Sequence, residues 1–150
     1  MANQLDILAF GAHPDDVELS CAGTILKEIA SGKKIGIVDL TRGELGTRGS
    51  AELRVQEAKK AASLLGVVCR ENLSFRDGFL INDEQHQIAV IEIIRKHKPK
   101  IVLCNAQTDR HIDHGRAATI VQDACFLSGL QKIETTLEGK SQEPWRPSQV

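Results

Sequence analysis

Residues 5–16 have the sequence LDILAFGAHPDD, in which an apolar run leads directly into the segment GAHPDD. An apolar run of this length is typical of a strand that is buried on both faces of a sheet. Three later runs have the same character, although polar residues dilute the second of them: 34–40 (KIGIVDL), 67–73 (VVCRENL) and 100–105 (KIVLCN). The sequence therefore predicts four buried strands.

Segments with helical periodicity follow the strands, at 17–30, 51–65, 83–96 and from about residue 113. Ser50 is expected to cap the second helix and Gly66 to end it. In the first helix, the face that we expect to be buried carries Leu19, Gly23, Leu26 and Ala30.

Alternation of buried strands with helices predicts an α/β fold: a Rossmann-like parallel sheet with helices on both faces. The commonest strand order for such a sheet is 3-2-1-4, in which the first and fourth strands are neighbours and the chain reverses direction between them. Ligands bind at the carboxyl ends of those two strands. We therefore expect the functional site beside residues 11–16 and the loop after residue 105.

Composition excludes several classes of protein. The 150 residues are expected to form a single domain, and a net charge of −1 provides no basic excess for nucleic acid or an anionic membrane. No apolar run is long enough to span a membrane and no signal peptide is evident, so we expect a cytoplasmic protein. The scattered cysteines are expected to be buried thiols: Cys21, Cys69, Cys104 and Cys125.

Histidines and carboxylates gather at both of the predicted strand ends. His13 and Asp16 are three residues apart at the start of a helix, so both side chains can face one point. His114, in the segment DRHIDH, can add a third ligand from across the crevice. Two histidines and one carboxylate with an open fourth position are typical of a catalytic zinc ion.

Three further side chains are expected to take part in catalysis. Asp15 lies about 100° round the helix from Asp16 and is positioned to take a proton from water. His111, with Asp113 as its orienting partner, is expected to act as the acid or to stabilise an oxyanion.

Substrate binding is expected from charged residues that surround these two clusters. The glycine-containing loop 41–49 carries Glu44, Arg54 lies in the first turn of the helix after that loop, where a cation opposes the helix dipole, and Arg110 lies within the segment DRHIDH. Each also has a simpler interpretation. The loop with Glu44 could be a flexible connector, the charge of Arg54 could be compensated within its own helix, and Arg110 could be a solvated side chain. Residues 96–98 (KHK) are expected to be a solvated face.

The metal ligands and the base together predict a metal-dependent hydrolase. Two other classes of protein are alternatives to it. A dinucleotide-binding protein could use Asp39 for a ribose contact, but no G-x-G-x-x-G follows the first strand, and Asp15 and Asp16 would repel a pyrophosphate. A metal-binding module without catalytic activity is the other alternative.

The segment GAHPDD, paired with His111-Ile-Asp-His114, resembles the LmbE-like, or PIG-L, family of zinc-dependent N-acetylglucosamine deacetylases. The matching order of elements covers essentially the whole chain. Residues 5–18, 52–54, 57–59 and 109–111 further resemble the branch that deacetylates N-acetylglucosaminyl malate in bacillithiol biosynthesis. A related deacetylase that acts on another N-acetylglucosamine conjugate, such as an inositol or a chitin oligomer, is the alternative.

The resemblance implies a role for each of the residues named above. His13, Asp16 and His114 would hold one zinc ion, Asp15 would be the general base, His111 and Asp113 would assist, and Arg54 and Arg110 would contact the sugar substrate. Family members are longer, and some carry a tyrosine in their carboxyl-terminal part, whereas this chain contains no tyrosine. We therefore expect a deacetylase domain truncated after residue 150, which lacks carboxyl-terminal strands and could self-associate as a homo-oligomer through an uncovered apolar face.

Overall fold

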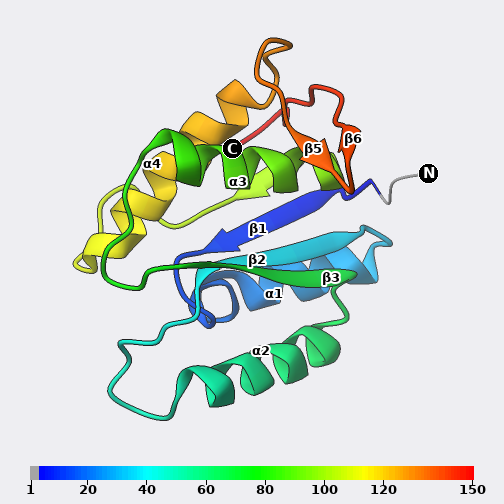
Figure 1. Ribbon diagram of the computed structural model, residues 1–150. Coiled ribbons are helices and arrows are strands. Elements are labelled where there is room, and N and C mark those ends of the chain that lie inside the picture. The colour runs from blue at the N-terminus through cyan, green and yellow to red at the C-terminus, as the bar shows by residue number, and fades with distance from the viewer. Residues whose placement is uncertain (1–3) are drawn as a thin grey trace.

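The computed structural model describes residues 4–150. Four strands form one sheet: β1 (Ile7–Gly11), β2 (Ile35–Thr41), β3 (Cys69–Phe75) and β4 (Ile101–Leu103). The helices that follow them are α1 (Asp16–Ala30), α2 (Ala51–Leu65), α3 (Glu84–His97) and α4 (Ile112–Leu127). The sheet forms the middle layer, with α1 and α2 on one face and α3 and α4 on the other (Figure 1).

The predicted strand order is confirmed, because the sheet runs β3-β2-β1-β4 and every pair is parallel. All residues of β1 and β2 are buried, as their nearly uninterrupted apolar sequences predict. β3 begins two residues later than expected and continues to Phe75. It is an edge strand that pairs only with β2 among the described strands, which explains why it tolerates the polar residues that diluted its pattern.

The predicted buried face of α1 is wrong. Leu19 is 81% exposed and Leu26 is 48% exposed, whereas Val17 and Ile25 are buried. Cys21 lies between these two positions on the inner face and interrupts the helix with φ −142°. Apolar residues occur on more than one side of this helix, so periodicity alone could not choose the stripe that packs on the sheet.

The predicted helix ends are confirmed. The Ser50 side chain accepts a hydrogen bond from the backbone N–H of Leu53 at 3.2 Å, and Gly66 ends α2 in the left-handed conformation. Asp83 caps α3 in the same way as Ser50 caps α2. Among residues 4–150, no helix combines the length and apolar character that a membrane span requires.

Residues 128–150 return along α3 and β4. A short hairpin of β5 (Thr136–Leu137) and β6 (Lys140–Ser141) packs beside α3, and Gln149 then forms a parallel bridge with Ile101 of β4. The buried Arg95 of α3 organises this return, because its guanidinium donates to three backbone carbonyls and a hydroxyl: those of Ser128, Leu130, Ile133 and Thr135.

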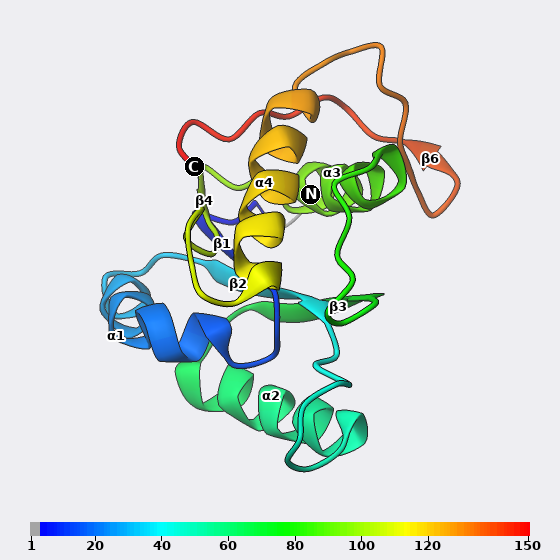
Figure 2. The same ribbon diagram turned by 90° about the vertical axis from the view of Figure 1, so that its left-hand side faces the viewer.

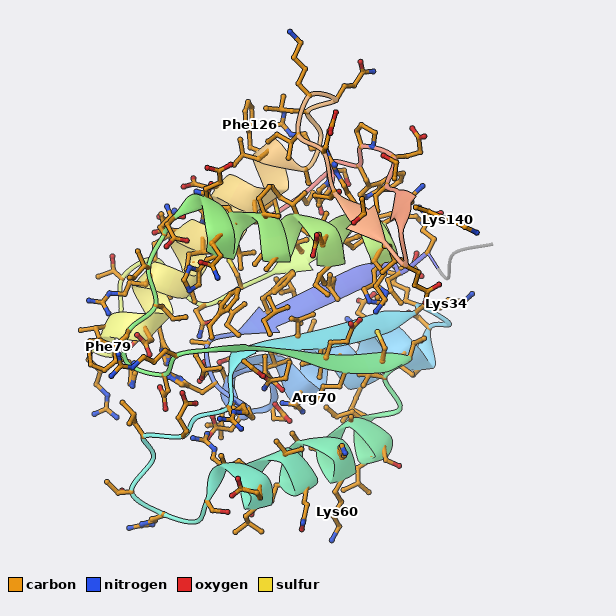
Figure 3. All side chains as sticks on the ribbon, viewed as in Figure 1. Lys34, Lys60, Arg70, Phe79, Phe126 and Lys140 are labelled. Carbon is orange, nitrogen blue, oxygen red and sulfur yellow. The ribbon has the colours of Figure 1, made fainter. Side chains whose placement is uncertain are left out.

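A buried ion-pair cluster joins the sheet to α1. Arg70 of β3 donates to both carboxylate oxygens of Asp39 on β2, at 2.8 and 2.9 Å, and also pairs with Glu18 of α1. The side chains of Arg70 and Asp39 are only 7% and 3% exposed. Arg70 projects between the sheet and the helices beneath it (Figure 3). Both carboxylate oxygens of Asp39 are therefore occupied by Arg70. They are not available for the ribose contact that a dinucleotide-binding protein would need.

We predict that Arg70→Met lowers the free energy of unfolding by about 3–5 kcal/mol, because it leaves the buried Asp39 carboxylate without its counterion. Urea denaturation measures this change. The exposed Lys60→Met on α2 is the control and should change stability by less than about 0.5 kcal/mol. Adding Asp39→Asn to Arg70→Met should restore part of the loss, and a double variant less stable than Arg70→Met would contradict the explanation.

Candidate active site

The carboxyl ends of β1 and β4 border a cavity of about 610 Å³. Figure 2 faces this edge of the sheet, where the loops that follow the strands meet. Its lining includes most of the residues that the sequence singled out: His13, Asp15, Asp16, Arg54, Arg110, His111 and His114. The expected position of the site is therefore the position of a real cavity.

His13 lies almost fully buried at the end of β1, and its two ring nitrogens face different carboxylates. Nε2 lies 3.0 Å from Asp77 and 3.3 Å from Asp113. Nδ1 lies 3.5 Å from Oδ2 of Asp16. A proton on Nε2 would be held by the buried pair of carboxylates and would leave the Nδ1 lone pair free on the Asp16 side.

His114, on α4, also has its two ring nitrogens directed at different carboxylates. Its Nδ1 lies 2.9 Å from Asp109 and its Nε2 lies 3.3 Å from Oδ1 of Asp16. Each histidine thus has one nitrogen directed at Asp16 and the other at an outer carboxylate. Outer carboxylates of this kind fix the tautomer and orientation of metal-binding histidines.

Asn105 fixes the third member of this set. Its side-chain amide accepts from the backbone N–H of Ala12 at 2.9 Å and donates to Oδ2 of Asp16 at 3.0 Å. Since Asn105 follows β4 and Ala12 follows β1, this one amide joins the two strand ends. Asp16 is therefore positioned from both sides of the crevice.

The carboxylates control protonation at the site. Burial by itself lowers the pKa of His13, but Asp16, Asp77 and Asp113 outweigh burial and raise that pKa to about 9. Burial raises the pKa of Asp16, but hydrogen bonds from His13 and Asn105 outweigh it and hold that pKa at about 2. The site therefore carries a concentrated negative charge that favours a cation at its centre.

The donor atoms fit a divalent metal ion. Histidine nitrogens and carboxylate oxygens are the usual ligands of catalytic zinc. Around His13, two groups of possible ligands have their donor atoms within 4.8 Å of one another: His13, His111 and His114, and His13, Asp77 and Asp113. Oδ1 of Asp113 is also buried without a hydrogen-bond partner among the described residues.

The side of His13 that faces Asp77 and Asp113 is the less open of the two. Asp113 is completely buried and accepts from the backbone N–H of Gly78 at 2.7 Å, and Asp77 accepts from that of Leu45 at 2.9 Å. A catalytic metal needs an open position for water and substrate. Asp16 and His114 both line the cavity, whereas on the other side Asp77 lines it and the fully buried Asp113 does not, so the side that faces Asp16 meets this need better.

The expected base lies beside these ligands, but its side chain pairs with a different residue. Asp15 is half-exposed, and its Oδ1 pairs with Nη2 of Arg54 at 2.9 Å. Arg54 also donates to the backbone carbonyl of Gly43 at 3.2 Å, so it links α2 and the loop after β2 to the start of α1. Gly43 has a φ of +63°, in the left-handed region that favours glycine, and a Cβ there would also meet the Arg54 guanidinium.

His111 and Asp113 lie two positions apart in the sequence and contact each other differently from expectation. Nδ1 of His111 accepts from the backbone N–H of Asp113 at 3.3 Å, an N-terminal cap of α4. The Asp113 carboxylate instead contacts His13 and Gly78. Because Nδ1 accepts, the proton of neutral His111 is on Nε2, where it can be donated to a ligand in the cavity.

The two other expected substrate-binding residues differ in position. Arg110 lines the cavity and is exposed. Glu44 is not among the lining residues, and its Oε1 accepts from the backbone N–H of Asp77 at 2.9 Å. Glu44 thus supports the residue that orients His13.

Sequence reasoning missed Asp77 and Asn105, and it gave no role to Asp109, which lies in the segment DRHIDH. All three follow strands whose carboxyl ends lie at this edge of the sheet, which is the signal that could have found them. Asp77 and Asn105 lie outside the two histidine-containing segments.

Comparison with known proteins identifies a family model and relatives that this chain matches. Residues 8–125 match the family model PIG-L, described as GlcNAc-PI de-N-acetylase. The sequence is 31% identical over 134 residues to diacetylchitobiose deacetylase of Thermococcus kodakarensis, covering 83% of this chain and 50% of that protein.

Solved structures are also similar to this fold. The conserved protein TT1542 from Thermus thermophilus superposes with a TM-score of 0.87 and 38% identity, over 97% of this chain and 64% of that one. N,N'-diacetylchitobiose deacetylase from Pyrococcus horikoshii superposes with a TM-score of 0.79 and 29% identity, over 84% and 51%. The chain spans between half and two thirds of the length of these three proteins. From the family match and the shared fold, the chain belongs to the PIG-L family.

Proposed function

We propose that this chain carries the catalytic site of a zinc-dependent deacetylase that removes acetate from an N-acetylglucosamine conjugate. The observation that carries the proposal is the position of Asp16 beside an open cavity: its two carboxylate oxygens lie 3.5 Å from Nδ1 of His13 and 3.3 Å from Nε2 of His114. Asp15 lies at the same cavity without being one of the three. Family membership supports the reaction class.

His13, Asp16 and His114 would hold the metal. When bound, a zinc ion at such a site polarises a carbonyl group and makes water more acidic. Asp77, Asp113 and Asp109 hold the outer nitrogens of the two histidines and keep the inner ones directed at Asp16.

Asp15 is the proposed base for hydrolysis of the acetamide. Arg54 holds Oδ1 of Asp15, and Oδ2 has no hydrogen-bond partner within residues 4–150 and can accept a proton. Water adds to the acetamide carbon as Asp15 takes its proton, and the same proton then passes to the sugar nitrogen as the C–N bond breaks. The products are acetate and a free amine.

His111 is the proposed oxyanion donor. Its ring centroid lies 4.6 Å from that of His13 and 4.8 Å from that of His114, so it borders the proposed reaction centre. Nε2–H of His111 can donate to the oxygen that becomes negative when water adds to the carbonyl.

For the substrate, we propose N-acetylglucosaminyl malate, with Arg54 and Arg110 as cationic residues at the cavity that suit its carboxylates. A chitin oligomer is the second candidate, because two similar proteins are diacetylchitobiose deacetylases.

Acetate release by the full-length, zinc-loaded protein distinguishes these substrates. We predict faster release from N-acetylglucosaminyl malate than from diacetylchitobiose. Faster release from diacetylchitobiose would replace the first substrate with the second, and zinc binding without release from either would indicate a metal-binding module.

We predict that Asp15→Asn retains zinc but lowers the rate of acetate release by at least about 100-fold, because no other carboxylate in the proposed mechanism is free to take the proton. Metal analysis and the acetate assay measure the two effects. Glu84→Gln, which changes an exposed carboxylate on α3, is the matched control and should leave both unchanged. An Asp15→Asn protein with unchanged turnover would remove Asp15 as the base.

We also predict that zinc affinity depends steeply on pH. With a pKa of about 9, His13 carries a proton at neutral pH that the metal must displace. Affinity should therefore rise about tenfold per pH unit from roughly pH 7 and level off above the His13 pKa. Competition with a chelator measures it, and His86→Gln, which changes a histidine outside the cavity, should retain the slope. An affinity that stays constant over this window would contradict the proposed role of His13.

A further inference from the structure

A second group of side chains that could bind a metal ion lies far from the cavity, at the amino-terminal ends of the strands. Cys69 and Glu71 are the first and third residues of β3, and His97 is the last residue of α3. Residues two apart on a strand project from the same face, so Cys69 and Glu71 both face α3. In the sheet register Cys69 is opposite Gly36, at the end of β2 remote from the cavity.

The three side chains are close enough to share one ion. Sγ of Cys69, a carboxylate oxygen of Glu71 and a ring nitrogen of His97 all lie within 4.8 Å of one another. Oε1 of Glu71 contacts Nε2 of His97, and Oε2 accepts from Nζ of Lys96 at 2.7 Å. Lys96 therefore fixes the outer oxygen of Glu71 and leaves the inner one facing Cys69 and His97.

The expectation of a solvated face over residues 96–98 is wrong for His97. Its exposed fraction is 8%, and its neighbours are Glu71 and Cys69 rather than solvent alone. Gly36 makes room for the thiol, because a Cβ there would lie 2.8 Å from Sγ of Cys69. Burial and the Glu71 charge raise the pKa of the Cys69 thiol, although Lys96 opposes this, so the free thiol holds its proton.

We propose that Cys69, Glu71 and His97 form a second binding site, for a divalent transition-metal ion such as zinc. A thiolate, an imidazole and a carboxylate are all zinc ligands, and the thiolate selects against Mg²⁺ and Ca²⁺. On binding, the ion replaces the proton of the Cys69 thiol, which passes to solvent. The ion would join the edge strand β3 to the end of α3.

Titration of the metal-free chain with Co²⁺ tests this second site directly. Co²⁺ bound by a thiolate has a charge-transfer absorption in the near ultraviolet, and the proposed catalytic site contains no cysteine. We predict that the wild-type chain shows this absorption and that Cys69→Ser abolishes it. Cys21→Ser, which changes another partly buried thiol, is the matched control and should retain the absorption.

The proposals of the second site and of the catalytic site can be tested independently of each other. His13→Ala should remove the ion at the cavity and retain the thiolate absorption, whatever the outcome of the acetate assay. A wild-type chain without the absorption, or an absorption that persists in Cys69→Ser, would overturn the second site.

Alkylation of the wild-type chain provides a test that needs no variant. Zinc should protect Cys69 from iodoacetamide at least several-fold, whereas modification of Cys21 and Cys104 in the same sample should not change. Mass spectrometry of the peptides measures each cysteine separately. Equal modification of Cys69 with and without zinc would also overturn the proposal.

Discussion

The imidazole of His13 lies among three carboxylates, and the geometry of the cavity depends on this arrangement. Asp16, Asp77 and Asp113 come from the start of α1, the loop after β3 and the first turn of α4. Carboxylates this close repel one another unless a cation lies between them. A protonated His13 supplies one positive charge, and a bound divalent ion would supply two. The loops that form the cavity therefore share a common electrostatic centre.

Support for this centre extends outward through successive hydrogen bonds. Glu44 holds the backbone of Asp77, Asp77 holds His13, and Asn105 joins Asp16 to the end of β1. Each contact connects segments that are distant in sequence but meet at the carboxyl edge of the sheet. The second cluster, at the other end of β3, shows the same combination of a strand residue and a helix terminus. Both arise because parallel strands bring together residues at each end of the sheet.

Much of this arrangement could be predicted from the sequence. Apolar runs separated by capped helices predicted a parallel sheet, and the commonest strand order for such a sheet, which the structure has, placed GAHPDD beside the segment DRHIDH. The inner face of α1 could not be predicted, because Leu19 and Leu26 compete with Val17 and Ile25 and only tertiary packing decides between them. Asp77 and Asn105 are single polar residues after strands, with no periodic pattern, so their contacts with His13 and Asp16 depend on loop conformations. His97 belongs to a charged run whose burial becomes evident only when β3 lies beside α3.

The position of the metal tests this account most directly, because His13 has carboxylates on both sides of its ring. Anomalous diffraction at the zinc edge, from crystals of the zinc-loaded protein, locates the ion without reference to activity. We predict an anomalous peak bounded by Nδ1 of His13, the Asp16 carboxylate and Nε2 of His114. A peak between Nε2 of His13, Asp77 and Asp113, or no peak at the cavity, would contradict it.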